Sequence, residues 1–193
     1  MLNKYLEEDF GISEMEEMLY QADRVLLEPS EAALEWDKAC EYYEKCKYRA
    51  QGVAGYDYAE MGKYGCRITG SGYEDKDAMV EMMAASEKAD AKWEKYDKVR
   101  GNCLKKIAEC LASGKITEVQ SNVLKARYCS GTNGIVGYAE VAQMAGLSDY
   151  KQAYYQHQKA RDAFALWLHD VKVQENYQRC LMNPPAYTST LYC

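Results

Sequence analysis

Apolar residues recur at three- and four-residue intervals along most of the chain, and the first such stretch follows Ser13. Three glutamates directly after Ser13 lie in the first turn, where acidic side chains interact favourably with the helix dipole. The pattern continues to about Leu27. Because Pro29 has no backbone donor, we expect this helix to stop before it and Ser30 to cap a second helix over residues 31–50.

The pattern breaks over residues 51–76, where six glycines alternate with four tyrosines. Connections of this length are usually either functional or mobile. No Gly-x-x-x-x-Gly-Lys-Ser/Thr sequence is present, so a phosphate-binding loop is disfavoured.

The longest periodic segment begins at Asp77 and ends near Gly114, which predicts one helix of about nine turns. Two interpretations of its apolar face remain open: packing in a helical bundle, or a coiled-coil arm that forms a homodimer through residues 77–112. The apolar face is predicted to contain Met79, Met82, Ala89, Trp93, Tyr96, Cys103, Ile107 and Cys110.

A capping box opens the next helix, with Thr117 at the cap and Gln120 three residues later. This helix carries Val119, Val123, Leu124, Ala126 and Tyr128 and ends at Cys129-Ser130-Gly131. A glycine-rich turn over residues 131–137 follows it.

A short helix is predicted from Tyr138, and Gly146 supplies the left-handed residue that a tight turn needs. Ser148 is the expected cap of a long helix that begins near Asp149. We interpret His157, which lies near the inner stripe, as a packed core residue and not a catalyst. The inner stripe is predicted to contain Ala153, Ala160, Phe164, Trp167 and Leu168.

These elements predict an all-α fold, with an N-terminal helical arm or bundle and a long central helix followed by a helix-turn-helix domain. The expected divisions are residues 1–50, an N-terminal helical segment; 51–76, the Gly/Tyr-rich connection; 77–114, the long amphipathic helix; 115–182, the helix-turn-helix domain; and 183–193, a tail.

Composition agrees with a folded globular chain, with 48% hydrophobic and 28% charged residues. Charges interrupt every apolar run, and the acidic N-terminus has no apolar run behind it, so we expect a cytoplasmic protein without a membrane segment.

The eight cysteines form no Cys-x-x-Cys and have no histidine at zinc-ligand spacing. Free thiols are the favoured interpretation over a metal site or a disulfide framework. We expect no enzyme, no catalytic residues and no cofactor, because the sequence shows no nucleophile elbow, metal-ligand spacing or nucleotide loop.

The stretch from Ile116 to about Leu168 resembles the helix-turn-helix of sigma-factor region four. It is more similar still to the ArpU/RinA-type late-gene regulators of phages that infect Gram-positive bacteria. The matching elements are residues 116–128, residues 138–148 and the long helix with Tyr154, Lys159 and Ala160.

The resemblance implies that the long helix enters the major groove of double-stranded DNA in a bacterial host cell. Lys125 and Arg127 would then lie near the DNA backbone. The residues expected to face base edges or phosphates are Lys151, Gln152, Tyr155, Gln158 and Lys159.

The charge distribution leaves two functions open. Residues 114–193 contain eight Lys and Arg against six Asp and Glu, a charge of +2, whereas residues 1–113 carry 16 against 24, a charge of −8. A weakly basic module on an acidic body needs either a second copy or a protein partner, because phosphate neutralisation supplies much of DNA affinity. The first function is a phage or mobile-element transcription regulator. The alternative is an anti-CRISPR-type inhibitor whose acidic surface competes with nucleic acid on a host RNA-guided nuclease or another basic protein.

Overall fold

The computed structural model describes residues 12–52, 76–131 and 134–182, so most of the Gly/Tyr-rich connection and the whole predicted tail lie outside the described residues. Five α-helices and no strand occur within those ranges, which confirms the predicted all-α class. The helices are α2 (Ile12–Gly52), α4 (Lys76–Ala112), α5 (Glu118–Cys129), α6 (Tyr138–Met144) and α7 (Tyr150–Met182).

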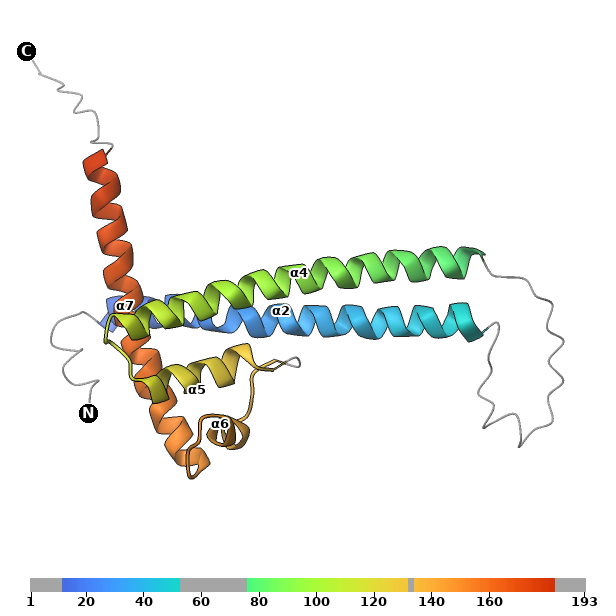
Figure 1. Cartoon of the computed structure of the whole chain (residues 1–193). Helices are drawn as coiled ribbons and strands as arrows, with labels where there is room; N and C mark the ends of the chain where they lie inside the picture. Colours follow the sequence, from blue (N-terminus) through green and yellow to red (C-terminus); the bar gives the residue numbers. More distant parts are fainter. Residues whose placement is uncertain (1–11, 53–75, 132–133, 183–193) are drawn as a thin grey trace, which may run out of the picture.

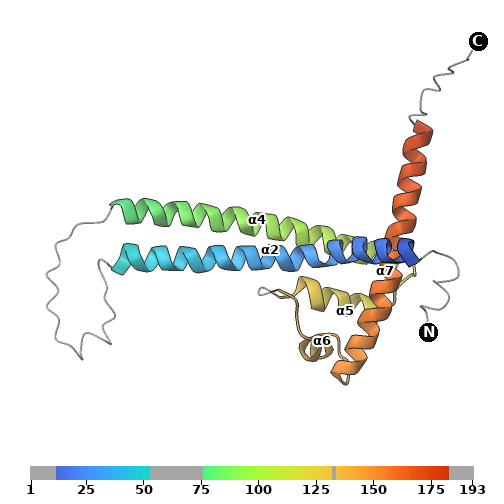
Figure 2. The ribbon, with the colours of Figure 1, turned by 180° about the vertical axis from the view of Figure 1, so that it is seen from behind.

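Helices α2 and α4 lie side by side and antiparallel, and together they form the long arm seen in Figures 1 and 2. Buried apolar residues recur on both helices mainly at spacings of four and seven residues, as in a two-stranded coiled coil. Half of these residues are alanines, which lets the two helices approach closely. The buried set is Met18, Ala22, Leu26, Ala32, Ala33, Ala39 and Cys46 on α2, and Ala78, Ala85, Ala89, Tyr96, Cys103, Ile107 and Cys110 on α4.

The predicted break before Pro29 is wrong, because α2 runs through this proline without interruption. Proline deprives the carbonyl of Val25 of its helical donor, a local cost of about 3 kcal/mol or more. Packing of α2 along α4 on both sides of Pro29 holds the two halves in line. Ser30 does not cap a helix: its buried hydroxyl donates to the Tyr128 carbonyl oxygen at 3.3 Å and so joins α2 to α5.

Toward the C-terminus of α4 the predicted apolar residues are the buried ones. Toward its N-terminus the buried side of the helix is rotated away from the predicted side. Met79 and Trp93 are each 43% exposed, whereas Ala78 and Ala85 are buried against α2. The pattern in the sequence favours large apolar residues, but small ones occupy a close helix contact. Since α2 of the same chain covers this face, a homodimer through it is not supported.

Helices α5 and α6 and residues 150–168 of α7 pack together beside one end of the arm, and we call them the three-helix unit. A small core holds the unit together, made of Val123, Ala126, Val136, Val141, Ala142 and Ala153. A larger core lies where α7 crosses the arm, and it includes Met18, Leu26, Ile107, Leu124, Phe164 and Trp167. The predicted inner stripe of the long helix is confirmed, since all five of its residues are buried.

Residues 172–179 of α7 are exposed and extend past the arm on the side opposite α5 and α6 (Figure 1). None of the helices in the described ranges is both long and apolar enough to cross a membrane.

Candidate nucleic-acid interface

One side of the first turns of α7 is turned away from the core. Ala153, His157 and Ala160 are buried, so with 100° between successive residues the opposite side of the helix faces outward. Five of the predicted DNA-contacting residues fall within about a third of the circumference on that side. Lys151, Gln152, Tyr155 and Lys159 are exposed, and Gln158 is half-buried. We call these five residues the α7 face.

A tight turn sets the direction in which α7 leaves α6. Gly146 has the predicted left-handed conformation, with φ of 67°. The Leu147 amide donates to the Ala142 carbonyl oxygen at 2.8 Å, and the Gly146 amide donates to that of Gln143 at 3.3 Å. This pair of hydrogen bonds is a Schellman motif, which satisfies carbonyl groups at the end of α6. Leu147 then packs against the small core of the three-helix unit.

The cap of α7 is Asp149, not Ser148 as the sequence predicted. The Asp149 carboxylate accepts a hydrogen bond from the Gln152 backbone amide at 2.8 Å, and the helix begins at Tyr150. Asp and Ser are equally good caps, and the position of the first helical residue decides between them. The N-terminus of α7 therefore carries a negative charge, which disfavours a phosphate at that end.

Arg127 is used inside the protein. Its Nη1 donates to the Val136 carbonyl oxygen at 2.8 Å, and its guanidinium carbon lies 3.9 Å from the centre of the Tyr138 ring. The Val136 amide in turn donates to the Arg127 carbonyl oxygen at 3.0 Å. These contacts hold the segment between α5 and α6 against α5, and they engage Nη1 and one face of the guanidinium within the fold. Lys125, on the same helix, is half-buried.

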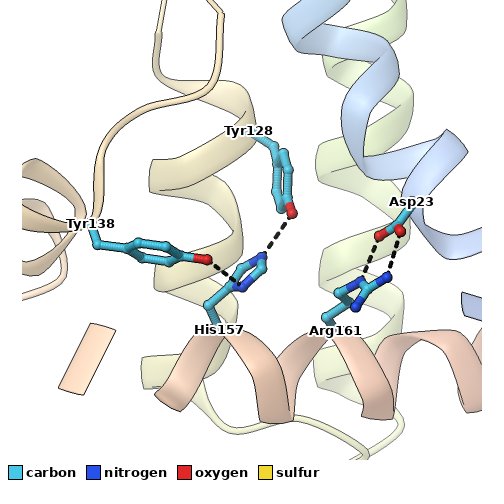
Figure 3. Close-up of polar contacts among 5 residues, drawn as sticks. All are labelled: Asp23, Tyr128, Tyr138, His157 and Arg161. Carbon is cyan, nitrogen blue, oxygen red and sulfur yellow. Dashed lines mark hydrogen bonds and ion pairs between the residues drawn. The ribbon is translucent and has the colours of Figure 1, made fainter. Parts of the chain in front are cut away.

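His157 lies at the centre of a buried polar network (Figure 3). The Tyr128 hydroxyl lies 2.7 Å from its Nε2 and the Tyr138 hydroxyl 3.1 Å from its Nδ1. A neutral imidazole has one donor and one acceptor, so both hydroxyls are satisfied in either tautomer. Burial, together with the positive charges of Arg127 and Arg161, lowers the pKa of His157 to about 4. The prediction that His157 is a packed core residue is confirmed, and its role is to fix α7 against α5 and α6.

One turn further along α7, Arg161 binds Asp23 of α2 through two parallel hydrogen bonds. The distances are 2.6 Å from Nε to Oδ1 and 2.5 Å from Nη2 to Oδ2. Both side chains are partly buried, and the hydrogen bonds to Asp23 raise the pKa of Arg161. This ion pair fastens the three-helix unit to the arm. No local pattern could reveal this ion pair, since 138 residues separate the partners.

Tyrosines line one side of the α7 face, and two of them were not among the predicted contact residues. Tyr150 and Tyr154 are exposed beside Tyr155, and the Tyr154 ring packs edge-on against the Tyr138 and Tyr155 rings. Positions one turn apart on a helix lie on one side, so a helical projection from Tyr150 would have found Tyr154.

The charge of this surface is balanced. Lys151 and Lys159 are offset by Asp149 at the start of α7 and by Asp162 beside the face. Burial raises the pKa of Asp162. Its carboxylate therefore takes up a proton more readily as the pH falls, and it then no longer offsets the positive charge of the two lysines. Within the ranges that the structure describes, no three His, Cys, Asp or Glu side chains come together to hold a metal ion.

No protein-family model, no curated protein and no solved structure matches this chain.

Proposed function

We propose that the chain is a DNA-binding transcription regulator of a phage or other mobile element, with α6 and α7 acting as a helix-turn-helix. The observation that carries this proposal is the α7 face. Its lysine, glutamine and tyrosine side chains lie on the side of α7 opposite its buried residues, and four of the five are exposed. The resemblance of residues 116–168 to the ArpU/RinA-type regulators supports the same conclusion.

The chemistry of the α7 face suits a major groove. Gln152 can pair with adenine through its amide, and Lys151 and Lys159 can bind guanine or a phosphate. Lys151 and Lys159 lie about 12 Å apart along the helix axis, which corresponds to three or four base pairs. The two hydrogen-bonded anchors, His157 and Arg161, hold this face in a fixed direction, as readout of base edges requires.

Electrostatic attraction makes a small contribution in this proposal. Only two lysines on the face can neutralise phosphates, so we expect a slope of log affinity against log salt of about −2 for each copy. Most of the affinity must then come from base contacts and from the binding of more than one copy of the chain to the same DNA.

Selection from short duplexes of random sequence tests the proposal. The full chain is expected to enrich a common motif, and fluorescence anisotropy on that motif measures affinity at several salt concentrations. Changing Lys159→Ala should weaken binding and reduce the salt slope by about 1, whereas Gln152→Ala should reduce discrimination between the motif and a scrambled duplex.

Lys98→Ala is the matched control, because Lys98 is an exposed lysine on α4 of the arm. It removes the same charge and should leave binding unchanged. Failure to enrich any motif, with no duplex binding at low salt, would refute the proposal. An equal loss in Lys98→Ala and Lys159→Ala would show that binding reflects overall charge and not the α7 face.

The charge of α2 favours a second function, inhibition of a host RNA-guided nuclease. Within residues 12–31 five glutamates are exposed, and the only basic residue is Arg24. Such a surface can occupy a positively charged nucleic-acid channel. Binding of the purified chain to an RNA-guided nuclease, lost when Glu28 and Glu31 are changed to glutamine, would favour this function. If the wild-type chain binds no RNA-guided nuclease and the glutamine variants regulate a reporter promoter as the wild type does, the regulator stands alone.

A further inference from the structure

Two cysteine thiols meet inside the protein at the junction of the arm and the three-helix unit. Cys103 lies on α4 and Cys129 is the last residue of α5. They are 2% and 3% exposed and belong to the same core. Both are free thiols, and their side chains are hydrogen-bonded to each other.

The charges around this pair distinguish the two sulfur atoms. The hydrogen bond from Cys103 lowers the pKa of the Cys129 thiol, burial acts in the opposite direction, and the positive charges of Arg100 and Lys125 add to the lowering. Arg100 is held close, because its Nε donates to the Cys129 carbonyl oxygen at 2.8 Å. The same thiol–thiol hydrogen bond, with burial, raises the pKa of Cys103. The thiolate, which is the reactive form, therefore forms more readily at Cys129 than at Cys103.

A small reagent can reach Cys129 through local opening of the protein, because the thiol is buried at the end of a helix. The residue ends α5, and the next residue, Ser130, is exposed. Terminal helical turns open at lower free energy than the rest of a fold, so transient opening of this turn admits a small molecule without global unfolding.

We propose that Cys103 and Cys129 form an oxidation site that converts to a disulfide on reaction with a hydroperoxide, independently of the proposed DNA binding. The Cys129 thiolate attacks the peroxide, the O–O bond breaks, and the leaving hydroxide takes up a proton as water. Cys129 is then a sulfenic acid. The Cys103 sulfur attacks it, the S–O bond breaks, and a second water leaves with the Cys103 proton. Two thiols and one hydrogen peroxide thus give one disulfide and two waters.

Cys110 provides an internal comparison. It lies on α4 one heptad after Cys103, is fully buried, and has its pKa raised to about 11, mainly by burial. It is therefore protonated at neutral pH and should not react. The disulfide would tie α4 covalently to α5, across the boundary between the arm and the three-helix unit.

Peptide mapping tests the proposal directly. The reduced full chain is treated with hydrogen peroxide, unfolded in iodoacetamide and digested with trypsin without reduction. Cleavage after lysine and arginine places Cys103 in residues 101–105 and Cys129 in residues 128–151, each as the single cysteine of its peptide. We expect these two peptides to be joined as the main product, with Cys110 recovered in its alkylated form. Recovery of both peptides unlinked, or a different main disulfide, would overturn the proposal.

Variants test the order of the two steps, with circular dichroism as the check on folding. In Cys103→Ser the reaction should stop at the sulfenic acid, which dimedone traps on Cys129. In Cys129→Ser dimedone should not label Cys103, and labelling there would overturn the assigned roles. Cys110→Ser is the matched control and should form the same linked peptides as the wild type. If a variant fails to fold, the peptide map of the peroxide-treated wild type still shows whether the Cys103–Cys129 disulfide forms.

Discussion

His157 and Arg161 lie one turn apart on α7 and fasten that helix to two different parts of the molecule (Figure 3). His157 bonds to tyrosines of the three-helix unit, and Arg161 pairs with Asp23 of the arm. Residues four apart share a side of a helix, so this one stretch sets both the rotation of α7 and its position on α2. The α7 face is therefore fixed relative to the arm.

The ion pair should contribute measurably to stability. Asp23→Ala leaves the partly buried Arg161 guanidinium without its partner, and we expect the free energy of unfolding in urea to fall by about 1–2 kcal/mol. The control is Asp170→Ala, which removes the more exposed pair between Lys115 and Asp170. That change should cost less than about 0.5 kcal/mol. Equal losses in the two variants would contradict the role given to Asp23.

His157 should make stability depend on pH. Its pKa is about 4 in the folded chain against an ordinary value of 6.5, so between these values the unfolded chain binds more protons. Stability is therefore fully present above about pH 6.5 and is lost as the pH falls toward 4. The shift corresponds to about 3 kcal/mol at most. Urea unfolding across this range measures it.

The groups facing His157 define the controls for that measurement. Arg127 and Arg161 lower its pKa and Asp23 raises it, so all three contribute to the effect. His157→Gln keeps a donor and an acceptor between the two tyrosines but does not titrate, and should flatten the profile between pH 4 and 6.5. A His157→Gln profile as steep as that of the wild type would show that another group is responsible.

The sequence predicted those elements that local rules determine. The capping box at Thr117 and Gln120 is present with both of its hydrogen bonds, at 3.3 and 2.9 Å. Gly146 has the expected positive φ, and the inner stripe of α7 is buried. Each of these depends on residues a few positions apart, so a single sequence carries the whole signal.

The sequence misled wherever distant parts of the chain decide the outcome. Pro29 breaks a lone helix, but here α4 supports α2 on both sides of it. Arg127 has the charge for a phosphate, yet Tyr138 and Val136 engage it within the fold. The residues of the α7 face were expected from the resemblance to known regulators, whereas the anchors that orient the face join α7 to α5, α6 and α2. Those partners could not be paired without the structure.

The alanine contacts of the arm give a test of its intramolecular packing. Ala89 is buried against α2, whereas Ala91, two residues later on α4, is exposed. Ala89→Leu forces a large side chain between closely packed helices and should lower the free energy of unfolding by about 1–3 kcal/mol. Ala91→Leu should change it by less than about 0.5 kcal/mol. If Ala89→Leu is neutral and light scattering shows a dimer in the wild type, this face of α4 packs against a second copy.

The turn between α6 and α7 gives a test that separates backbone strain from steric fit. At Gly146 an added methyl group would meet no atom within 4 Å, but φ is 67°. Gly146→Ala should therefore cost about 1–2 kcal/mol through conformation alone. Gly137, at the start of α6, has φ of −66° and equally open space, so Gly137→Ala should be close to neutral. Urea unfolding measures both.

If the α7 face reads DNA, Gly146→Ala should also weaken binding to the selected motif more than Gly137→Ala does, because it shifts the angle at which α7 leaves α6. Equal stability of the two variants would mean that the turn does not require a left-handed residue at Gly146.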